Sequence, residues 1–475
     1  MIDGLSVFEL NYLLYRCDNE ERDANGGSAC YHVPGYGDLV YAGLQGFMSV
    51  IQNPDSYAYH CLNENLKVGS WALWYTSNRL KRGKLKFVSK WLEERWNEIE
   101  TLPSHTRPFW FFEVIKYVYG LAVAYIYEKH FKYGDIESYD MPFAFTLTLG
   151  SIQMLGESRS GGLPSRCFID KDNETIASLA AGLPHFSTRH MRCWGRDTFI
   201  AFRGFFLHIG LHSHGLDHLV AFASCIYNGL IPNLLDGGNY PRYNSRDATW
   251  WWVKALQDYH ELHPHVLDVQ LRRRFPRSKG YVWCEPDDPR AFSQIATLKD
   301  ILVEVLSRHY TGIEFVEPRA EEYTELCPEG YIIKSQRDHT TGFLHGGNIW
   351  NACTWMDKVG ECKATGNYRI PSTPRDGAPI EITALVHRAL CWAEQLKLGL
   401  DFVSEWRQSI EHSFEKEYLF YDDLSNKMYY KDLVGCENVQ HGLELRPNYL
   451  IAMVVVNEFF LRLHHCLAKR TRLRP

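Results

Sequence analysis

Helical periodicity is the feature of this sequence that most constrains its fold. Apolar residues recur at spacings of three and four over residues 88–99 and 382–396, which places them on one face of a helix. We expect amphipathic helices there and over six further ranges: 39–51, 197–212, 216–230, 247–263, 292–310 and 403–418. Clear alternating strands are scarce. The sequence therefore predicts an all-α fold.

Loops rich in Gly, Pro, Asn and Asp separate these helices and hold most of the residues that could carry chemistry. The main loops are 231–244, 283–290, 345–351 and 366–379. Because Trp, Arg and Asp gather at helix ends, an all-α chain of 475 residues fits a helical toroid better than a bundle. We expect one (α/α)6 barrel, a six-hairpin toroid, as a single domain over residues 1–475.

Charge and cysteine content narrow the class of protein. Lys and Arg number 51 against 57 Asp and Glu, a net charge of -6, so we expect no nucleic-acid partner. The 13 cysteines form no Cys-x-x-Cys pair and lack zinc-site spacing, which indicates thiols in a reducing compartment. Residues 1–16 lack the features of a signal peptide. We expect a cytoplasmic protein.

The most apolar stretch, 109–127, contains the charged residues Glu113 and Lys116. Because charges are costly to bury in lipid, we expect a buried helix and no membrane partner.

One group of side chains has metal-ligand chemistry: His212, His214, Asp217 and His218. We expect Gly215 to break the helix that would align them, so histidines at a helix end are the favoured interpretation. The chain contains no phosphate-binding Gly-Lys-Ser/Thr loop, dinucleotide fingerprint, His-Glu-x-x-His or Gly-x-Ser-x-Gly motif. We expect no metal and no cofactor.

Aromatic residues make up 14% of the chain, and their flat faces suit sugar rings, although most of them would simply fill a core. Hydrolysis of a glycosidic bond also needs two carboxyl groups. In the segment 193–198, Arg196 and Asp197 could hold a pair of sugar hydroxyls while Trp194 walls the pocket. The alternative is that Asp197 only caps a helix.

Two further segments place carboxylates beside tryptophans. Asn244, Arg246 and Asp247 precede three consecutive tryptophans, and the alternative there is an Arg-Asp ion pair over packed rings. Asp357 lies next to Trp355 and Met356. Apolar surroundings would favour its protonated form, as a general acid requires, although Lys358 would oppose this if it pointed inward. Asp357 is therefore the best acid candidate.

The pattern of a fourth segment, 373–377, predicts a turn that leads into a helix. Charged residues, up to Glu381, would lie at the start of that helix. Asp376 lies in this segment. The alternative is a simple capped turn.

Several segments together resemble the C-terminal glucosidase region of eukaryotic glycogen debranching enzyme. They are 41–46, 180–187, 192–201, 229–235, 242–244, 246–247, 354–358, 374–377 and 445–448, within a resemblance that runs from about residue 13 to about 460. The resemblance implies an (α/α)6 domain with amylo-α-1,6-glucosidase activity, which removes the single α-1,6-linked glucose left at a trimmed glycogen branch. Glycogen or limit dextrin would be the partner.

The resemblance also assigns roles to residues. Asp357 is similar in placement to the general acid of inverting α-toroid glucosidases. The residues expected to bind substrate are Trp194, Arg196, Asp197, Arg246, Asp247 and Trp355, with Asn244 and Asp376 as weaker assignments.

The chain departs from the family in two ways. These 475 residues hold neither a counterpart of the family's N-terminal 4-α-glucanotransferase half nor a Tyr-His-Gln-Gly-Pro-Glu-Trp segment, in which we would expect the catalytic base. Residues 461–475 form a basic tail unlike the family. We therefore expect a toroid incomplete at its C-terminal end and of marginal stability, with Asp376, Glu381 and Glu444 as substitutes for the base.

Two other functions stay open from the sequence. One is a catalytically impaired, glycogen-binding paralogue or fragment. The other is a different α-toroid enzyme such as a trehalase, which conflicts with the set of motifs.

Overall fold

The computed structural model describes residues 1–27, 32–131, 140–171, 176–236, 240–277, 280–317, 330–351, 353–424 and 426–460. The expected basic tail, 461–475, lies outside the described residues. The described chain is mostly helical, and its short strands form small sheets of two or three strands. This confirms the expectation of a helical protein.

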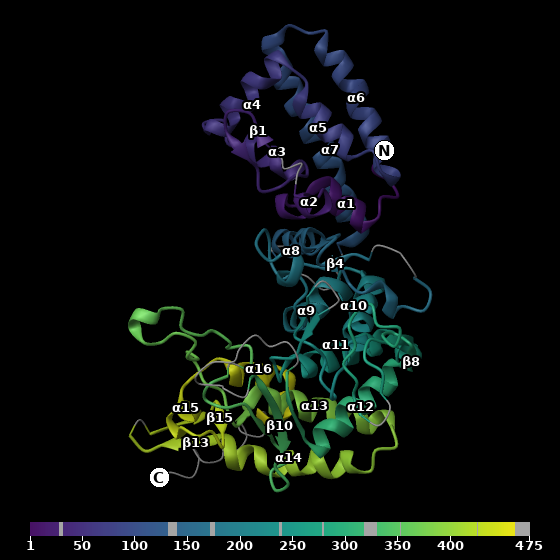
Figure 1. The fold of residues 1–475 in the computed structure, drawn as a ribbon. Helices are drawn as coiled ribbons and strands as arrows, with labels where there is room; N and C mark the ends of the chain where they lie inside the picture. Colours follow the sequence, from purple (N-terminus) through teal and green to yellow (C-terminus); the bar gives the residue numbers. More distant parts are fainter. Residues whose placement is uncertain are drawn as a thin grey trace.

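The N-terminal third of the chain is a series of helices that lies at one end of the molecule (Figure 1). Their bounds are α1 Val7–Leu14, α2 Asp18–Ala24, α3 Leu44–Ile51, α4 Tyr57–Val68, α5 Trp71–Arg79, α6 Lys86–Glu100, α7 Arg107–His130 and α8 Met141–Met154. The expected helix over 88–99 is found as α6, and the one over 39–51 is shortened to α3. A capping box of Ser6 and Glu9 begins α1.

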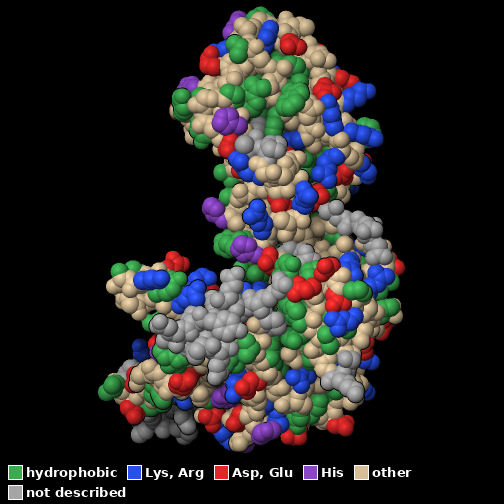
Figure 2. All heavy atoms as spheres, in the orientation of Figure 1, with side chains coloured by type: hydrophobic (Ala, Val, Ile, Leu, Met, Phe, Trp, Pro, Cys, Tyr) green, Lys and Arg blue, Asp and Glu red, His purple; other side chains and the backbone are tan. Residues whose placement is uncertain are grey.

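Helix α7 corresponds to the apolar stretch 109–127, which was expected to be buried, but only part of its surface is buried. One stripe of α7 packs against α3, α4 and α6, while Phe109, Trp110 and Tyr117 on its other faces are exposed. Figure 2 shows apolar side chains at the surface over this end of the molecule. By length and composition the segment Ser104–His130 could cross a membrane, with a third of its most apolar window (33%) buried inside the protein. Periodicity alone could not show how many neighbours this helix has.

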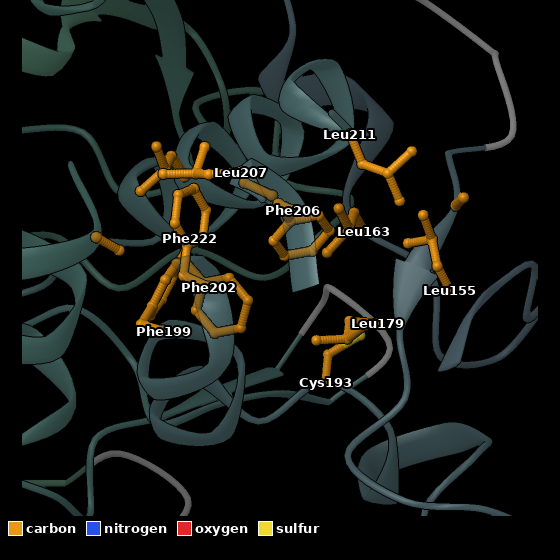
Figure 3. Packing of buried hydrophobic residues seen from close by; sticks show 14 of the residues in the cluster. Leu155, Leu163, Leu179, Cys193, Phe199, Phe202, Phe206, Leu207, Leu211 and Phe222 are labelled. Atoms are coloured by element: carbon orange, nitrogen blue, oxygen red, sulfur yellow. The ribbon is translucent and has the colours of Figure 1, made fainter. Parts of the chain in front are cut away.

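Eight α-helices lie from residue 195 onward in the described part of the chain, and most of them pack against one another. The bounds are α9 Gly195–Phe202, α10 His212–Ser224, α11 Ala248–Leu262, α12 Leu298–Thr311, α13 Ile380–Leu396, α14 Phe402–Tyr418, α15 Val439–Leu443 and α16 Asn448–Val455. Helix α11 packs against α9 and α13, and α13 packs against α16, while α10 and α14 flank this series. Figure 3 shows part of the core, where the rings of Phe199 and Phe222 meet edge to face at 5.0 Å.

Several boundaries in this half differ from those expected: the helix over 197–212 ends as α9 at Phe202, and the one over 216–230 is α10, His212–Ser224. Two further differences have a clear cause. Gly215 does not break a helix but lies inside α10, where an added Cβ would come within 3.2 Å of the Phe202 and Phe206 side chains. Close helix packing therefore explains this glycine. Helix α12 begins at Leu298 rather than near 292, because Thr297 and Asp300 form a capping box.

The strands connect the helices and support the loops. Their antiparallel pairs are β1 His32–Val33 with β2 Gly37–Asp38, β3 Leu155–Gly156 with β4 Ser178–Leu179, β5 Leu234–Asp236 with β6 Tyr240–Arg242, β7 Gln270–Arg273 with β8 Gln294–Thr297, β12 Ala378–Pro379 with β15 Leu433–Val434, and β13 Leu419–Asp422 with β14 Lys427–Tyr430. A three-stranded sheet joins β9 Ile313–Val316, β10 Ile332–Arg337 and β11 Leu344–Gly346. Two loops that follow these strands, 180–194 and 353–358, carry the candidate site.

Candidate active site

A pocket of about 510 Å³ lies between loop 180–194, helix α9 and loop 353–358. Five of the residues singled out from the sequence line it: Trp194, Arg196, Asp197, Trp355 and Asp357. Folding therefore brings together motifs that lie about 160 residues apart in the chain, as the Arg196–Asp357 contact shows.

Arg196 is the link between these motifs. It lies in the first turn of α9, and its Nε donates to the Asp247 carboxylate at 2.9 Å and 3.1 Å. Its Nη2 donates to Ser245 Oγ at 2.9 Å and to Asp247 Oδ1 at 3.0 Å, while Nη1 donates to Asp357 Oδ2 at 3.1 Å. Burial alone would lower the pKa of Arg196, but the carboxylates of Asp247 and Asp357 raise it. Arg196 is therefore a fixed cation that aims one carboxylate at the pocket.

Asp247 does not line the pocket but binds Arg196, which does. It is fully buried and pairs with Arg196 rather than with its neighbour Arg246, so the expected ion pair within segment 240–252 is not the one formed. Ser245 Oγ also donates to the Asp247 carboxylate. Asp247 thus holds Arg196 in place, and its contact with the pocket is indirect.

Asp357 lies between two cations. Its Oδ2 accepts from Arg196, and its Oδ1 accepts from Lys358 Nζ at 2.7 Å. The Asp357 side chain is 21% exposed and that of Lys358 is 90% exposed. The carboxyl therefore does not meet the purely apolar surroundings expected from the sequence. Because a pair with so exposed a lysine is weak, Arg196 is the stronger of its two partners.

Asp197 lies in the same pocket but, unlike Asp357, has no side-chain partner among the described residues. Its side chain is exposed and makes no hydrogen bond to another residue in the described part of the chain. The pocket walls desolvate the carboxyl and raise its pKa, and Asp357 adds to this rise, while Arg196 and Lys358 act against it. The N-cap of α9 is Trp194, with no side-chain cap, so Asp197 is not the capping residue of the alternative interpretation. Its carboxyl is free to meet a ligand.

Three other expected substrate-binding residues do not line the pocket. Arg246 is buried and donates to the carbonyls of Gly377 at 3.0 Å and Arg375 at 2.8 Å. Asp376 accepts from the Glu437 backbone at 2.7 Å. The Asn244 carbonyl accepts from the Tyr331 hydroxyl at 3.2 Å. Their contacts hold loops together, and a role in substrate binding stays a prediction.

The suggested substitutes for the base are also placed outside the pocket lining. Both oxygens of the buried Glu381 accept from Arg375, and Glu444 pairs with Arg446. A carboxylate bound to a guanidinium through both oxygens is poorly placed to take a proton from water.

Sequence reasoning missed a buried group of charges, the Asp432 cluster, made of Asp432, Arg375, Glu381, Arg446 and Asn448. Asp432 accepts from Arg375 at 3.1 Å, from Arg446 at 3.0 Å and from Asn448 at 2.6 Å. The Asn448 Oδ1 in turn accepts from Trp355 Nε1 at 2.8 Å. The cluster therefore anchors loop 353–358. In the sequence, only the segments 374–377 and 445–448, which carry the family resemblance, pointed to it.

Histidines of the possible metal group have other partners. His218 Nε2 accepts from the Leu179 backbone at 2.9 Å, and His212 contacts His263 at 2.6 Å. Within the described ranges, no group of three His, Cys, Asp or Glu side chains is arranged to hold a metal ion.

Comparison with known proteins connects this geometry to a family. A family model described as Amylo-alpha-1,6-glucosidase matches residues 150–470, which include the whole pocket lining. A second model, described as the Central domain of human glycogen debranching enzyme, matches residues 1–80. The glycogen debranching enzyme of Saccharomyces cerevisiae is 37% identical over 505 residues, which cover 97% of this chain and 32% of that enzyme. These matches confirm the resemblance, and the chain spans about a third of the length of that curated relative.

Proposed function

The chain belongs to the amylo-alpha-1,6-glucosidase family, and from this premise we propose that it is a glycoside hydrolase that releases the α-1,6-linked glucose at glycogen branch points. The observation that carries the proposal is the Asp357 carboxylate, held at 3.1 Å by Arg196 in a pocket that also contains Asp197. Its substrate would be glycogen or a limit dextrin.

Arg196 and Asp197 would bind the terminal glucose. Arginine has five N–H donors, and Arg196 directs four of them to Asp247, Ser245 and Asp357, which leaves one on Nη1 for a sugar hydroxyl. The Asp197 carboxyl, which lacks a partner among the described residues, would accept from a second hydroxyl. Trp194 and Trp355 line the same pocket and would pack against the ring.

Asp357 would act as the general acid of an inverting reaction. The proton would pass from its carboxyl to the leaving glycosidic oxygen, while a second carboxyl, about 6.5–9.5 Å away, activates water. Lys358 Nζ occupies Asp357 Oδ1, so the substrate must separate Lys358 from this oxygen before the oxygen can reach the glycosidic bond. The 90% exposure of Lys358 makes that separation easy.

Glucose release from a phosphorylase limit dextrin tests this function. We expect Asp357→Asn to lower kcat about 10²- to 10⁴-fold on limit dextrin. The loss should be much smaller on α-glucosyl fluoride, because fluoride leaves without needing a proton. Asp288→Asn is the matched control, since Asp288 has similar exposure, 19%, and pairs with Arg290 away from the pocket. Equal losses on both substrates would overturn the acid assignment.

A binding protein without hydrolysis is the second candidate. The contacts of Asp357 favour it, because Arg196 and Lys358 already occupy both carboxyl oxygens that would have to face the glycosidic oxygen. This protein would bind limit dextrin without releasing glucose, and Asp197→Ala would abolish the binding. Turnover by the wild type excludes it.

The finer fold and the location of the protein are part of the same proposal. The series α9, α11, α13 and α16, flanked by α10 and α14, supports the paired-helix arrangement of an (α/α)6 barrel. The two family models match 1–80 and 150–470 separately, and a single domain over 1–475 stays a prediction. All ten cysteines in the described ranges are free, which supports a reducing, cytoplasmic environment.

A further inference from the structure

Loop 180–194 carries an aromatic residue that the sequence analysis did not single out. Phe186 lines the pocket and is 42% exposed. Its ring lies over Gly182, where an added Cβ would come within 3.6 Å of Phe186 Cδ2. A glucose attached to a polymer can fill a pocket only if the rest of the glucan leaves through the open side. A ring that lines the pocket and is largely exposed can therefore contact the glucan as it leaves.

Helix α2 holds this loop from the N-terminal region. The Nδ2 of Asn19 donates to the Pro184 carbonyl at 2.9 Å, two residues before Phe186. The Ser187 hydroxyl donates to the same carbonyl at 2.6 Å. Asn19 lies in the part of the chain matched by the central-domain model, and Phe186 lies in the part matched by the glucosidase model.

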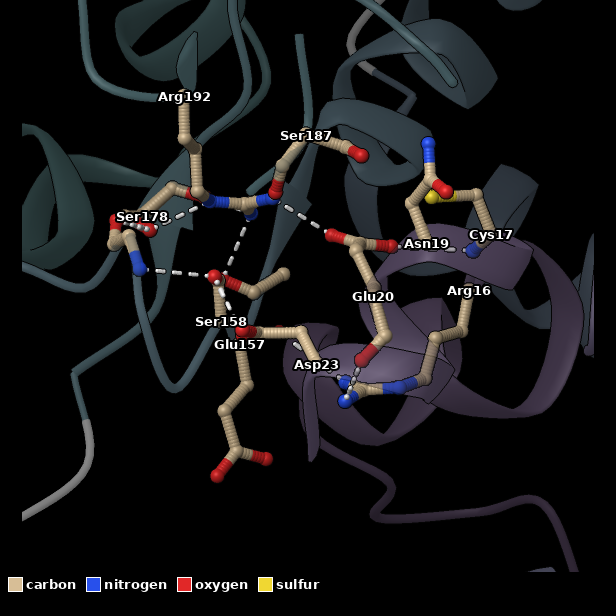
Figure 4. Close-up of polar contacts among 12 residues, drawn as sticks. Arg16, Cys17, Asn19, Glu20, Asp23, Glu157, Ser158, Ser178, Ser187 and Arg192 are labelled. Carbon is tan, nitrogen blue, oxygen red and sulfur yellow. Dashed lines mark hydrogen bonds and ion pairs between the residues drawn. The ribbon is translucent and has the colours of Figure 1, made fainter. Parts of the chain in front are cut away.

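A buried arginine makes the second connection, shown in Figure 4. Arg192 is fully buried, and its five N–H donors all have acceptors. We call this group the Arg192 cluster: Arg192 donates to Glu20 Oε1 at 2.7 Å, Ser187 O at 2.6 Å, Gly156 O at 3.0 Å, Ser178 O at 2.6 Å and Ser178 Oγ at 2.7 Å. The cluster fixes both ends of the segment 187–192 against α2.

We propose that Phe186 is the platform on which the glucan bearing the scissile glucose stacks, and that Asn19 and Glu20 are positioning residues that hold it at the pocket. The inference rests on the proposed function and extends it to a determinant of polymer recognition. It makes the N-terminal helix α2 part of the substrate site, although the pocket lining itself begins at Met154. Substrates that end at the glucose would not use the platform.

Steady-state kinetics on two substrates test the proposal. Limit dextrin reaches beyond the pocket, whereas α-glucosyl fluoride does not. We expect Phe186→Ala to raise KM for limit dextrin roughly 3- to 10-fold and to leave KM for α-glucosyl fluoride within about twofold. Asn19→Ala should show the same pattern with a smaller rise. In the double variant, Asn19→Ala should add nothing further, because it acts through the missing ring.

Asn65→Ala is the control for Asn19→Ala. Asn65 is also half-buried, and its Nδ2 donates to a proline carbonyl, Pro34 O, at 3.2 Å. It should lower the melting temperature by a similar amount and leave both KM values unchanged. Equal changes of KM on both substrates in Phe186→Ala, or full additivity in the double variant, would overturn the proposal. A wild type that releases glucose only from α-glucosyl fluoride would instead overturn the function on which it rests.

Discussion

The Arg192 cluster and the Asp432 cluster fix the two loops that form the pocket, but they are built from different partners. Arg192 meets one carboxylate, Glu20, and otherwise neutral oxygens. In the Asp432 cluster, Arg375 meets two carboxylates, Glu381 and Asp432. Because an unpaired buried charge is costly, the second cluster should be the more sensitive to loss of one member. The first directs three of the five N–H groups of Arg192 to backbone carbonyls, which no substitution removes.

The largest effect is therefore expected at Arg375. Arg375→Ala would leave the buried Glu381 without a counter-ion and Asp432 with Arg446 alone, which costs about 3–5 kcal/mol. Urea denaturation measures the free energy of unfolding. Arg290→Ala, which breaks an exposed pair with Asp288, should change nothing measurable. If both variants unfolded at the same urea concentration, the comparison between the clusters would fail.

Glu20→Gln should have a smaller effect, about 2 kcal/mol. Arg192 would lose its counter-ion but keep its carbonyl partners, and the Cys17 backbone N–H would lose a carboxylate acceptor. Glu9→Gln is the matched control, because Glu9 occupies the same capping-box position in α1 without a buried arginine. The same denaturation experiment applies, and a loss at Glu20 as large as at Arg375 would remove the distinction.

The buried carboxylate of Glu21, in the N-terminal region, should make the stability of the protein depend on pH. Burial alone would raise the pKa of Glu21, but Arg79 and Arg16 lower it below the ordinary value of about 4.5. The folded pKa is thus below the unfolded one, so this contribution is complete above about pH 4.5 and is lost as the pH falls through the folded pKa. Glu21→Gln should flatten the fall of stability in that window. An unchanged profile of melting temperature against pH would contradict it.

The motifs could be identified from the sequence, but the contacts between them could not be predicted. Arg196 and Asp357 stand in segments dense in Trp, Arg and Asp, so both could be found, and periodicity located α6 and α13. Asp432 stands alone among ordinary neighbours, and Phe186 lies in a recognised segment, 180–187, that gives no sign of which of its residues lines a pocket. The Glu20–Arg192 pair joins residues 172 positions apart, which no local pattern reveals. Likewise, the apolar residues of α7 could not show which of its faces a neighbour covers.

The smallest effect is expected at Lys358, the exposed partner in the pocket. Lys358→Ala removes the contact with Asp357 Oδ1 but leaves Arg196 in place, so the melting temperature should not change. Because an exposed ion pair contributes about 0–1 kcal/mol, kcat on limit dextrin should rise no more than about fivefold. The rise in kcat is expected because, in the proposed reaction, Lys358 must leave Asp357 before the proton is transferred. A fall in kcat would show instead that the lysine contacts the substrate, and that loop 353–358 binds glucan as loop 180–194 is proposed to do.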